Sequence, residues 1–76
     1  MIKRMINYVK NQELRIIYVN NSVDVVNYDK ILEVSDEIVI LLKANKLIYI
    51  RGKELKLNKL LDEEILISGI ITKIEL

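Results

Sequence analysis

Cysteine and histidine are both absent from the 76 residues of this chain. Without a thiol there is no disulfide, no thiolate nucleophile and no thiolate metal ligand. Without an imidazole, the chain lacks the side chain best suited to proton transfer near neutral pH and the commonest metal ligand in proteins. Ser22, Ser35 and Ser68 therefore have no histidine that could activate them as nucleophiles. These absences predict a protein that is not an enzyme and that has no catalytic residues, metal or cofactor.

Proline, phenylalanine and tryptophan are missing too, and glycine occurs only at Gly52 and Gly69. Long hydrophobic runs are also absent: the longest, residues 38–42, is far shorter than the roughly 20 residues of a membrane helix. Charged residues make up 30% of the chain at a net charge of +1, which is typical of a folded protein and not of a strongly basic nucleic-acid binder. We expect a cytoplasmic protein with a single small β domain over residues 14–76.

The first 13 residues form a separate lead-in with a different hydrophobic period. Ile2, Met5, Ile6 and Val9 recur at steps of three and four residues, with basic and amide side chains between them. This spacing indicates a short N-terminal helix, although two turns are marginal without docking. Two interpretations stay open: a segment that docks on its own domain, or a basic amphipathic helix whose apolar residues contact a membrane or a partner.

From Leu14 onward the hydrophobic period changes to two, which predicts β-strands rich in β-branched residues. About eight short strands are expected, over residues 14–19, 23–28, 31–34, 38–42, 47–50, 55–57, 65–67 and 70–76. Asn20-Asn21 and Asn45 supply turns, because Asn tolerates positive φ. The fold class is all-β, an antiparallel meander, small sandwich or open barrel. A short β-solenoid is the alternative, since short strands and polar corners recur.

Several strands are apolar on both sides, which is unusual for a one-sheet antiparallel domain. In the expected hairpin over residues 38–50 we assign alternate residues to two faces, one with the four isoleucines Ile38, Ile40, Ile48 and Ile50. The second face, together with the apolar Leu66 near the end of the chain, is the candidate protein interface: Val39, Leu41, Leu47, Tyr49 and Leu66. Either another chain, a second copy above all, covers this face, or the N-terminal segment covers it within one monomer.

Charged clusters are weaker signals. The carboxylates of Asp36-Glu37 and residues 62–64 lack the alternating spacing of a Ca²⁺ loop and fall at expected corners, which favours solvated side chains. A basic stretch from Lys43 to Lys59 is interleaved with Tyr49, a pattern that also occurs on nucleic-acid surfaces. Lysine on strand edges serves equally well to prevent aggregation, so nucleic-acid binding is the less favoured interpretation.

The last two-thirds of the chain carries a family resemblance. The stretches ILEVSDE (31–37), LIYIRGKELKL (47–57) and EILISGIITKIE (64–75) give a pattern of Gly, Leu and acidic positions. With this pattern, residues 14–76 resemble the YabP/YqfC family of sporulation proteins, and its YqfC-like branch in particular. One departure is Ala44-Asn45-Lys46, where the family tends to have Gly in the central hairpin.

The resemblance implies a protein of endospore formation in a Gram-positive spore former, on the mother-cell side near the forespore envelope, without known enzymatic activity. An excess of Ile, Lys and Asn, as an AT-rich genome encodes, agrees with such a source. We therefore expect a non-enzymatic structural or assembly protein that works through protein–protein contacts and self-association, with copies of itself or other sporulation proteins. The alternatives are a small nucleic-acid-binding regulator that uses the Lys43–Lys59 stretch, and a peripheral membrane adaptor.

Overall fold

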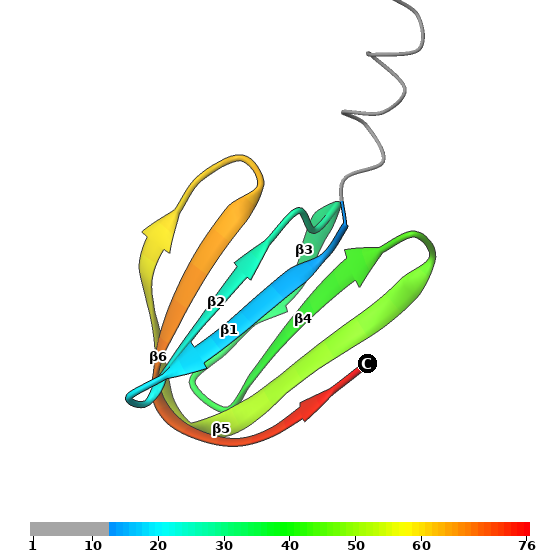
Figure 1. The fold of residues 1–76 in the computed structure, drawn as a ribbon. Coiled ribbons are helices and arrows are strands. Elements are labelled where there is room, and N and C mark those ends of the chain that lie inside the picture. Colours follow the sequence, from blue (N-terminus) through cyan, green and yellow to red (C-terminus); the bar gives the residue numbers. More distant parts are fainter. Residues whose placement is uncertain (1–12) are drawn as a thin grey trace, which may run out of the picture.

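The computed structural model describes residues 13–76, and in this range the chain folds into one antiparallel sheet without a helix. The strands are β1 (Arg15–Val19), β2 (Ser22–Val26), β3 (Lys30–Val34), β4 (Ile38–Lys43), β5 (Lys46–Leu60) and β6 (Glu64–Glu75). Their order across the sheet is β1-β2-β6-β5-β4-β3, so β1 and β3 are its edges (Figure 1). The all-β antiparallel prediction is confirmed. The expected N-terminal helix, with Ile2, Met5, Ile6 and Val9, lies outside the described residues.

Two tight hairpins are closed by two-residue loops in which both residues have positive φ. Asn20 and Asn21 have φ of 49° and 62° between β1 and β2, and Ala44 and Asn45 have φ of 50° and 65° between β4 and β5. This is the backbone of a type I′ turn, whose twist matches that of paired strands. The sequence prediction of turns at these asparagines is confirmed, and Ala44 adopts the left-handed conformation beside Asn45.

The structure has six strands where the sequence predicted about eight, because two expected breaks do not end a strand. β5 continues through Gly52 for 15 residues and β6 continues through Ser68 and Gly69 for 12 residues. In place of loops, the β5–β6 pairing shifts register at three points between Arg51 and Lys59. Such bulges bend a strand strongly. Figure 1 shows both strands curving at mid-length, which folds the sheet over on itself.

Glycine is required where β5 and β6 cross at this bend. A Cβ on Gly52 would collide with the carbonyl oxygen of Ile70. Gly69 has φ of +131°, and a Cβ there would lie 2.6 Å from the carbonyl oxygen of Glu54. Glu54 itself has φ of 53°, which L-residues seldom adopt. The close approach of two backbones therefore explains why the chain has glycine at its two glycine positions.

The bend divides the sheet into two halves that face each other. The β2 half contains β1, β2 and the paired segments 64–68 of β6 and 56–60 of β5. The β4 half contains β3, β4 and the paired segments 46–51 of β5 and 70–75 of β6. Side chains from both halves form one buried cluster: Val23, Val25, Tyr28, Val39, Leu41, Ile48, Ile50, Leu55, Ile65 and Ile67. Burying each such side chain contributes about 1.5–3 kcal/mol, and this core keeps the halves together.

Candidate protein-binding surface

The β4–β5 hairpin has a buried face and a solvent-facing face, and both are apolar. Val39 pairs with Ile50 and Leu41 with Ile48, and all four side chains are almost fully buried in the core. The intervening residues point to the outside of the β4 half, because side chains alternate along a strand. We call these residues the hairpin face: Ile38, Ile40, Leu42, Leu47 and Tyr49. Four are half-buried by their neighbours, and Leu47 is 40% exposed.

The candidate interface predicted from sequence is partly wrong, because Val39 and Leu41 belong to the core. Residues directly opposite each other in an antiparallel pair share a face. The two-residue loop pairs Lys43 with Lys46, so even-numbered residues of β4 lie opposite odd-numbered residues of β5. Leu47 and Tyr49 therefore share the outer face with Ile38, Ile40 and Leu42. The sequence prediction puts Ile38 and Ile40 on the other face and does not assign Leu42. The pairing register across the turn is the signal that identifies the correct face.

Charged side chains border the hairpin face at the end of β6. The Nε of Arg51 donates a hydrogen bond of 2.8 Å to Oε1 of Glu75, and the guanidinium lies 5.3 Å from the centre of the Tyr49 ring. The Nζ of Lys73 lies 3.6 Å from the other oxygen of Glu75. The hydrogen bond from Arg51 lowers the pKa of Glu75, and the charges of Lys73 and Arg51 act in the same direction. The carboxylate is thus held ionised at the rim.

A second ion pair lies at the turn of the β4–β5 hairpin, where Lys43 is on the same side of β4 as the core residues Val39 and Leu41. The Nζ of Lys43 lies 3.9 Å from Oδ1 of Asp29, and Oδ2 of Asp29 accepts a hydrogen bond of 2.8 Å from the backbone N–H of Ala44. This carboxylate thereby fastens the β4–β5 turn to the segment before β3. The hairpin face is an apolar stripe two strands wide, and charged residues of the flanking strands border it: Glu33 of β3 lies opposite Ile40, and Glu75 of β6 lies opposite Tyr49. An apolar centre with a charged rim is common in protein–protein interfaces.

Leu66, the remaining residue of the predicted interface, lies on the outside of the other half. Its cross-strand neighbours are Asp24 and Lys59, with Ile17 one strand further. Oδ1 of Asp24 is buried without a hydrogen-bond partner, and burial followed by the neighbouring carboxyl of Glu64 raises the pKa of Asp24. Leu66 is therefore separated from Leu47 and Tyr49, and its surroundings are charged.

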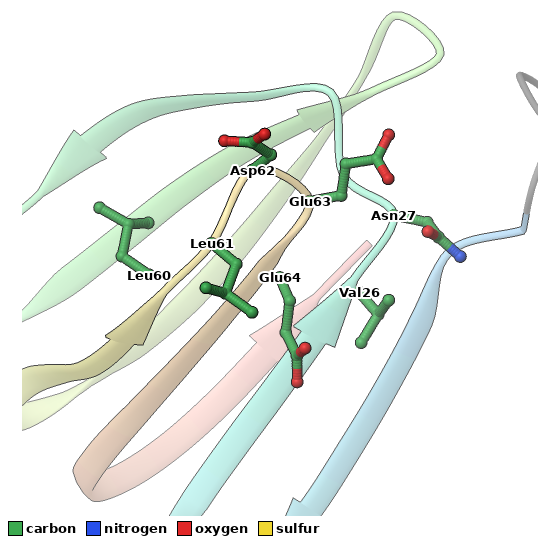
Figure 2. Close-up of a pocket in the computed structure, with 7 residues that line it drawn as sticks. All are labelled: Val26, Asn27, Leu60, Leu61, Asp62, Glu63 and Glu64. Carbon is green, nitrogen blue, oxygen red and sulfur yellow. The ribbon is translucent and has the colours of Figure 1, made fainter.

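The acidic corner at residues 62–64 joins β5 to β6 beside a shallow hollow. Figure 2 shows the hollow lined by Val26, Asn27 and residues 60–64, with the carboxylates of Asp62 and Glu63 pointing away from Leu61 and Glu64. Backbone hydrogen bonds close the corner, from Asn27 N to Glu63 O at 2.6 Å and from Leu61 N to Glu64 O at 2.8 Å. The acidic side chains therefore decorate a tight connection between strands.

The other acidic corner supports the bend of the sheet through its backbone. The carbonyl oxygens of Glu37 and Asp36 accept hydrogen bonds of 3.0 and 2.9 Å from the N–H groups of Gly52 and Leu55. Nowhere in residues 13–76 do three carboxylates, histidines or cysteines gather closely enough to hold a metal ion. Within the same range, no helix is long and apolar enough to span a membrane.

The basic stretch is distributed over both halves of the molecule, because β5 bends within it. Arg51 lies beside the hairpin face and is bonded to Glu75. Lys56 and Lys59 lie on the β2 half, opposite Ser68 and Leu66, and the Nζ of Lys59 is 3.7 Å from Oε1 of Glu64. These cations do not share one face that could follow a nucleic-acid backbone. The basic stretch therefore does not form one continuous cationic surface in the described part of the chain.

Comparisons with protein-family models, curated proteins and solved structures give no match. The resemblance to the YabP/YqfC family stays a prediction from the residues quoted above.

Proposed function

We propose that this chain is a non-enzymatic assembly protein, of the sporulation type that its sequence resembles, and that its copies associate through the hairpin face. The proposed place of action is the mother-cell side of the forespore envelope. The family resemblance supports the biological setting, and the hairpin face supports the mode of action.

One observation carries the proposal: the β4–β5 hairpin has a second apolar side that faces away from the core, with four half-buried residues and Leu47 at 40% exposure. Ile40 and Tyr49 form a cross-strand pair at its centre, and Leu42 and Leu47 form the next pair toward the turn. The charged Glu33 and Glu75 lie beside Ile40 and Tyr49 on the flanking strands, at a rim that solvent can still reach in a complex. Transfer of such a surface from water into a contact is favourable by about 25 cal/mol for each Å² of apolar area buried.

The test is the native mass of the purified full chain, measured by light scattering, with and without lysine in the hairpin face. We expect the wild type to exceed the chain mass of 8.9 kDa, and Leu47→Lys with Tyr49→Lys to lower the native mass. Two lysines per copy would have to be desolvated in the contact, which is costly. Neither side chain belongs to the buried core, so the circular dichroism spectrum of the β domain should be unchanged.

A matched control uses an exposed leucine elsewhere. Leu61 is 52% exposed at the corner before β6, compared with 40% for Leu47. Leu61→Lys makes the same change in charge as Leu47→Lys alone, and it should leave the native mass at the wild-type value. A wild-type protein that is monomeric at all concentrations would contradict the proposal, as would an equal loss of mass in the control.

A further inference from the structure

The folded sheet of residues 13–76 has four open edges, and they differ in protection. Two are β1 and β3, the ends of the strand order. The bend creates two more, since residues 56–60 of β5 pair only with β6, and residues 70–75 of β6 pair only with β5. An open edge exposes unpaired N–H and C=O groups that another strand can bind, so natural proteins protect edges with charges, bulges or short length.

Three of these edges carry such protection. The pairing of β3 shifts register between Ile31 and Glu33, and its exposed apolar side chains lie beside Lys30 and Glu33. The β5 edge has a register shift between Leu57 and Lys59 and two lysines, and the β6 edge ends in Lys73 and Glu75. A regular strand cannot extend these edges without meeting a bulge or a charge.

β1 is as short as β3, but it has no bulge and only one charge. Its pairing with β2 is regular over all five residues, and its one charge is Arg15 at the start. Ile17, Tyr18 and Val19 are 46%, 53% and 56% exposed, so apolar side chains are accessible on both faces of the strand. An unprotected apolar edge of this kind is a site for strand addition.

The hydrogen bonds of β2 determine which backbone groups of β1 are open. Asn21 accepts from the N–H of Gly69, and Asn27 donates to Glu63. The backbone groups of odd-numbered residues of β2 therefore hydrogen-bond to β6, and those of even-numbered residues of β2 hydrogen-bond to β1. The residues of β1 that receive these bonds are Arg15, Ile17 and Val19. The N–H and C=O groups of Ile16 and Tyr18 consequently point outward, because bonding direction alternates along a strand.

We propose that β1 pairs antiparallel with β1 of a second copy, with Ile17 facing Ile17 of the second copy on a twofold axis. In this register the outward N–H and C=O groups of Ile16 lie opposite those of Tyr18 of the second copy. Tyr18 likewise lies opposite Ile16 of the second copy, so the contact has four backbone hydrogen bonds in total. The four strands of each β2 half join into one continuous eight-stranded layer. The contact is isologous, as in most closed dimers.

A second copy is the occupant because this strand is complementary to itself. Centred on Ile17, all five residues overlap, and each Arg15 lies opposite a Val19, so like charges do not meet. A shift by two residues keeps the hydrogen-bonding direction but leaves part of the strand unpaired. This surface is separate from the hairpin face, since β1 belongs to the β2 half, and the inference does not depend on the proposed function.

Site-directed cross-linking tests the pairing, and the absence of cysteine from the chain makes each introduced thiol unique. In the register proposed, the two Ile17 Cα atoms are about 4.5 Å apart. That separation is within the range of about 4.4–6.8 Å that a disulfide spans. Under mild oxidation, Ile17→Cys should therefore form a covalent dimer. Val19→Cys is the control. The two residues 19 of the dimer are four residues apart along the strands, which is about 14 Å, so these thiols should stay mostly unlinked.

The experiment is performed in the Leu47→Lys, Tyr49→Lys background, so that the hairpin face does not contribute. We expect this background to have a native mass near twice the 8.9 kDa of the chain. Adding Tyr18→Pro should reduce the mass to that of the monomer, because proline removes an N–H that only the second copy uses. Circular dichroism checks that the domain stays folded.

Two results would overturn the inference: equal cross-linking at positions 17 and 19, or cross-linking at neither position. A third result, a background variant that is already monomeric in the absence of Tyr18→Pro, would do the same. None of these depends on whether lysines in the hairpin face reduce the wild-type mass, so failure of the edge contact and failure of the hairpin-face contact are distinguishable.

Discussion

The two outer faces of the folded sheet occupy equivalent positions but have opposite chemistry. At the centre of the β4 half, Ile40 lies opposite Tyr49, and the charged Glu33 and Glu75 lie on the strands at either side. At the centre of the β2 half, Asp24 lies opposite Leu66, Lys59 follows on the next strand, and Glu64 is a second carboxylate nearby. The pKa of the central carboxyl is raised by burial, whereas the pKa of Glu75 at the rim of the β4 half is lowered by Arg51.

This difference indicates which face a second protein can cover at low cost. A partner on the hairpin face would remove apolar side chains from water while the ion pairs stay at the margin. A partner on the β2 half would instead have to remove water from the charged Lys59 and Glu64, next to an Asp24 whose Oδ1 is already buried without a hydrogen-bond partner. The β2 half is therefore better suited to contact through its β1 edge than through its face.

The largest expected effect comes from destroying the core that holds the two faces on opposite sides. Leu41 is fully buried, and Leu41→Lys would place a charge among Ile48, Ile50 and the valines of β2. We expect the free energy of unfolding to fall by at least about 3 kcal/mol, enough to unfold much of a small domain. Urea denaturation measures the loss, and Leu47→Lys, on the opposite side of the same hairpin, is the control with little change. Equal destabilisation would contradict the assignment of the two sides.

The side of the hairpin on which each residue lies could not be predicted from the sequence alone. Period two along residues 38–50 indicated strands with two apolar sides, and the asparagines indicated turns, because both signals are local. Which residues of β4 share a side with which of β5 depends on pairing across the turn. That register places Leu41 with Ile48 and not with Leu47. Two of the five predicted interface residues are for this reason in the core.

The bend was beyond local reasoning as well. Gly52 and Gly69 interrupt the β pattern, which predicted strand ends, yet both lie inside long strands at points where two backbones nearly touch. A glycine that ends a strand and a glycine that admits a neighbouring backbone look alike in one sequence. Because a local pattern does not reveal the bend, the sequence groups Leu66 with the hairpin, although Leu66 lies on the other half.

An intermediate effect on stability is expected from removing the charge of Asp24 at the centre of the β2 half. Because the pKa of Asp24 is raised in the folded state, its ionised form destabilises the fold above the folded pKa. This penalty disappears as pH falls below the ordinary value of 3.8. Asp24→Asn removes the penalty and can donate to Glu64, so we expect stability at neutral pH to rise by about 1 kcal/mol or less.

Urea denaturation at neutral pH and at about pH 4 measures this change. The advantage of Asp24→Asn over the wild type should shrink on acidification, since the wild type then gains its proton. Glu33→Gln on β3 removes an exposed carboxylate and serves as the control. If Asp24→Asn is more stable than the wild type by the same amount at both pH values, then the charge of Asp24 is not what destabilises the fold.

The smallest effect is expected at the rim of the hairpin face, where Glu75→Gln removes the charge that pairs with Arg51 and Lys73. The lowered pKa means that the ionised carboxylate stabilises the fold at neutral pH and that this contribution is lost as pH falls through the folded pKa. The variant should therefore show a slight loss of stability at neutral pH, which about 1 M salt abolishes because exposed charges are screened. The native mass should change far less than in Leu47→Lys, since rim charges mainly affect association rates. If Glu75→Gln dissociates the protein as effectively as Leu47→Lys, then the ion pairs, and not the apolar centre, hold the copies together.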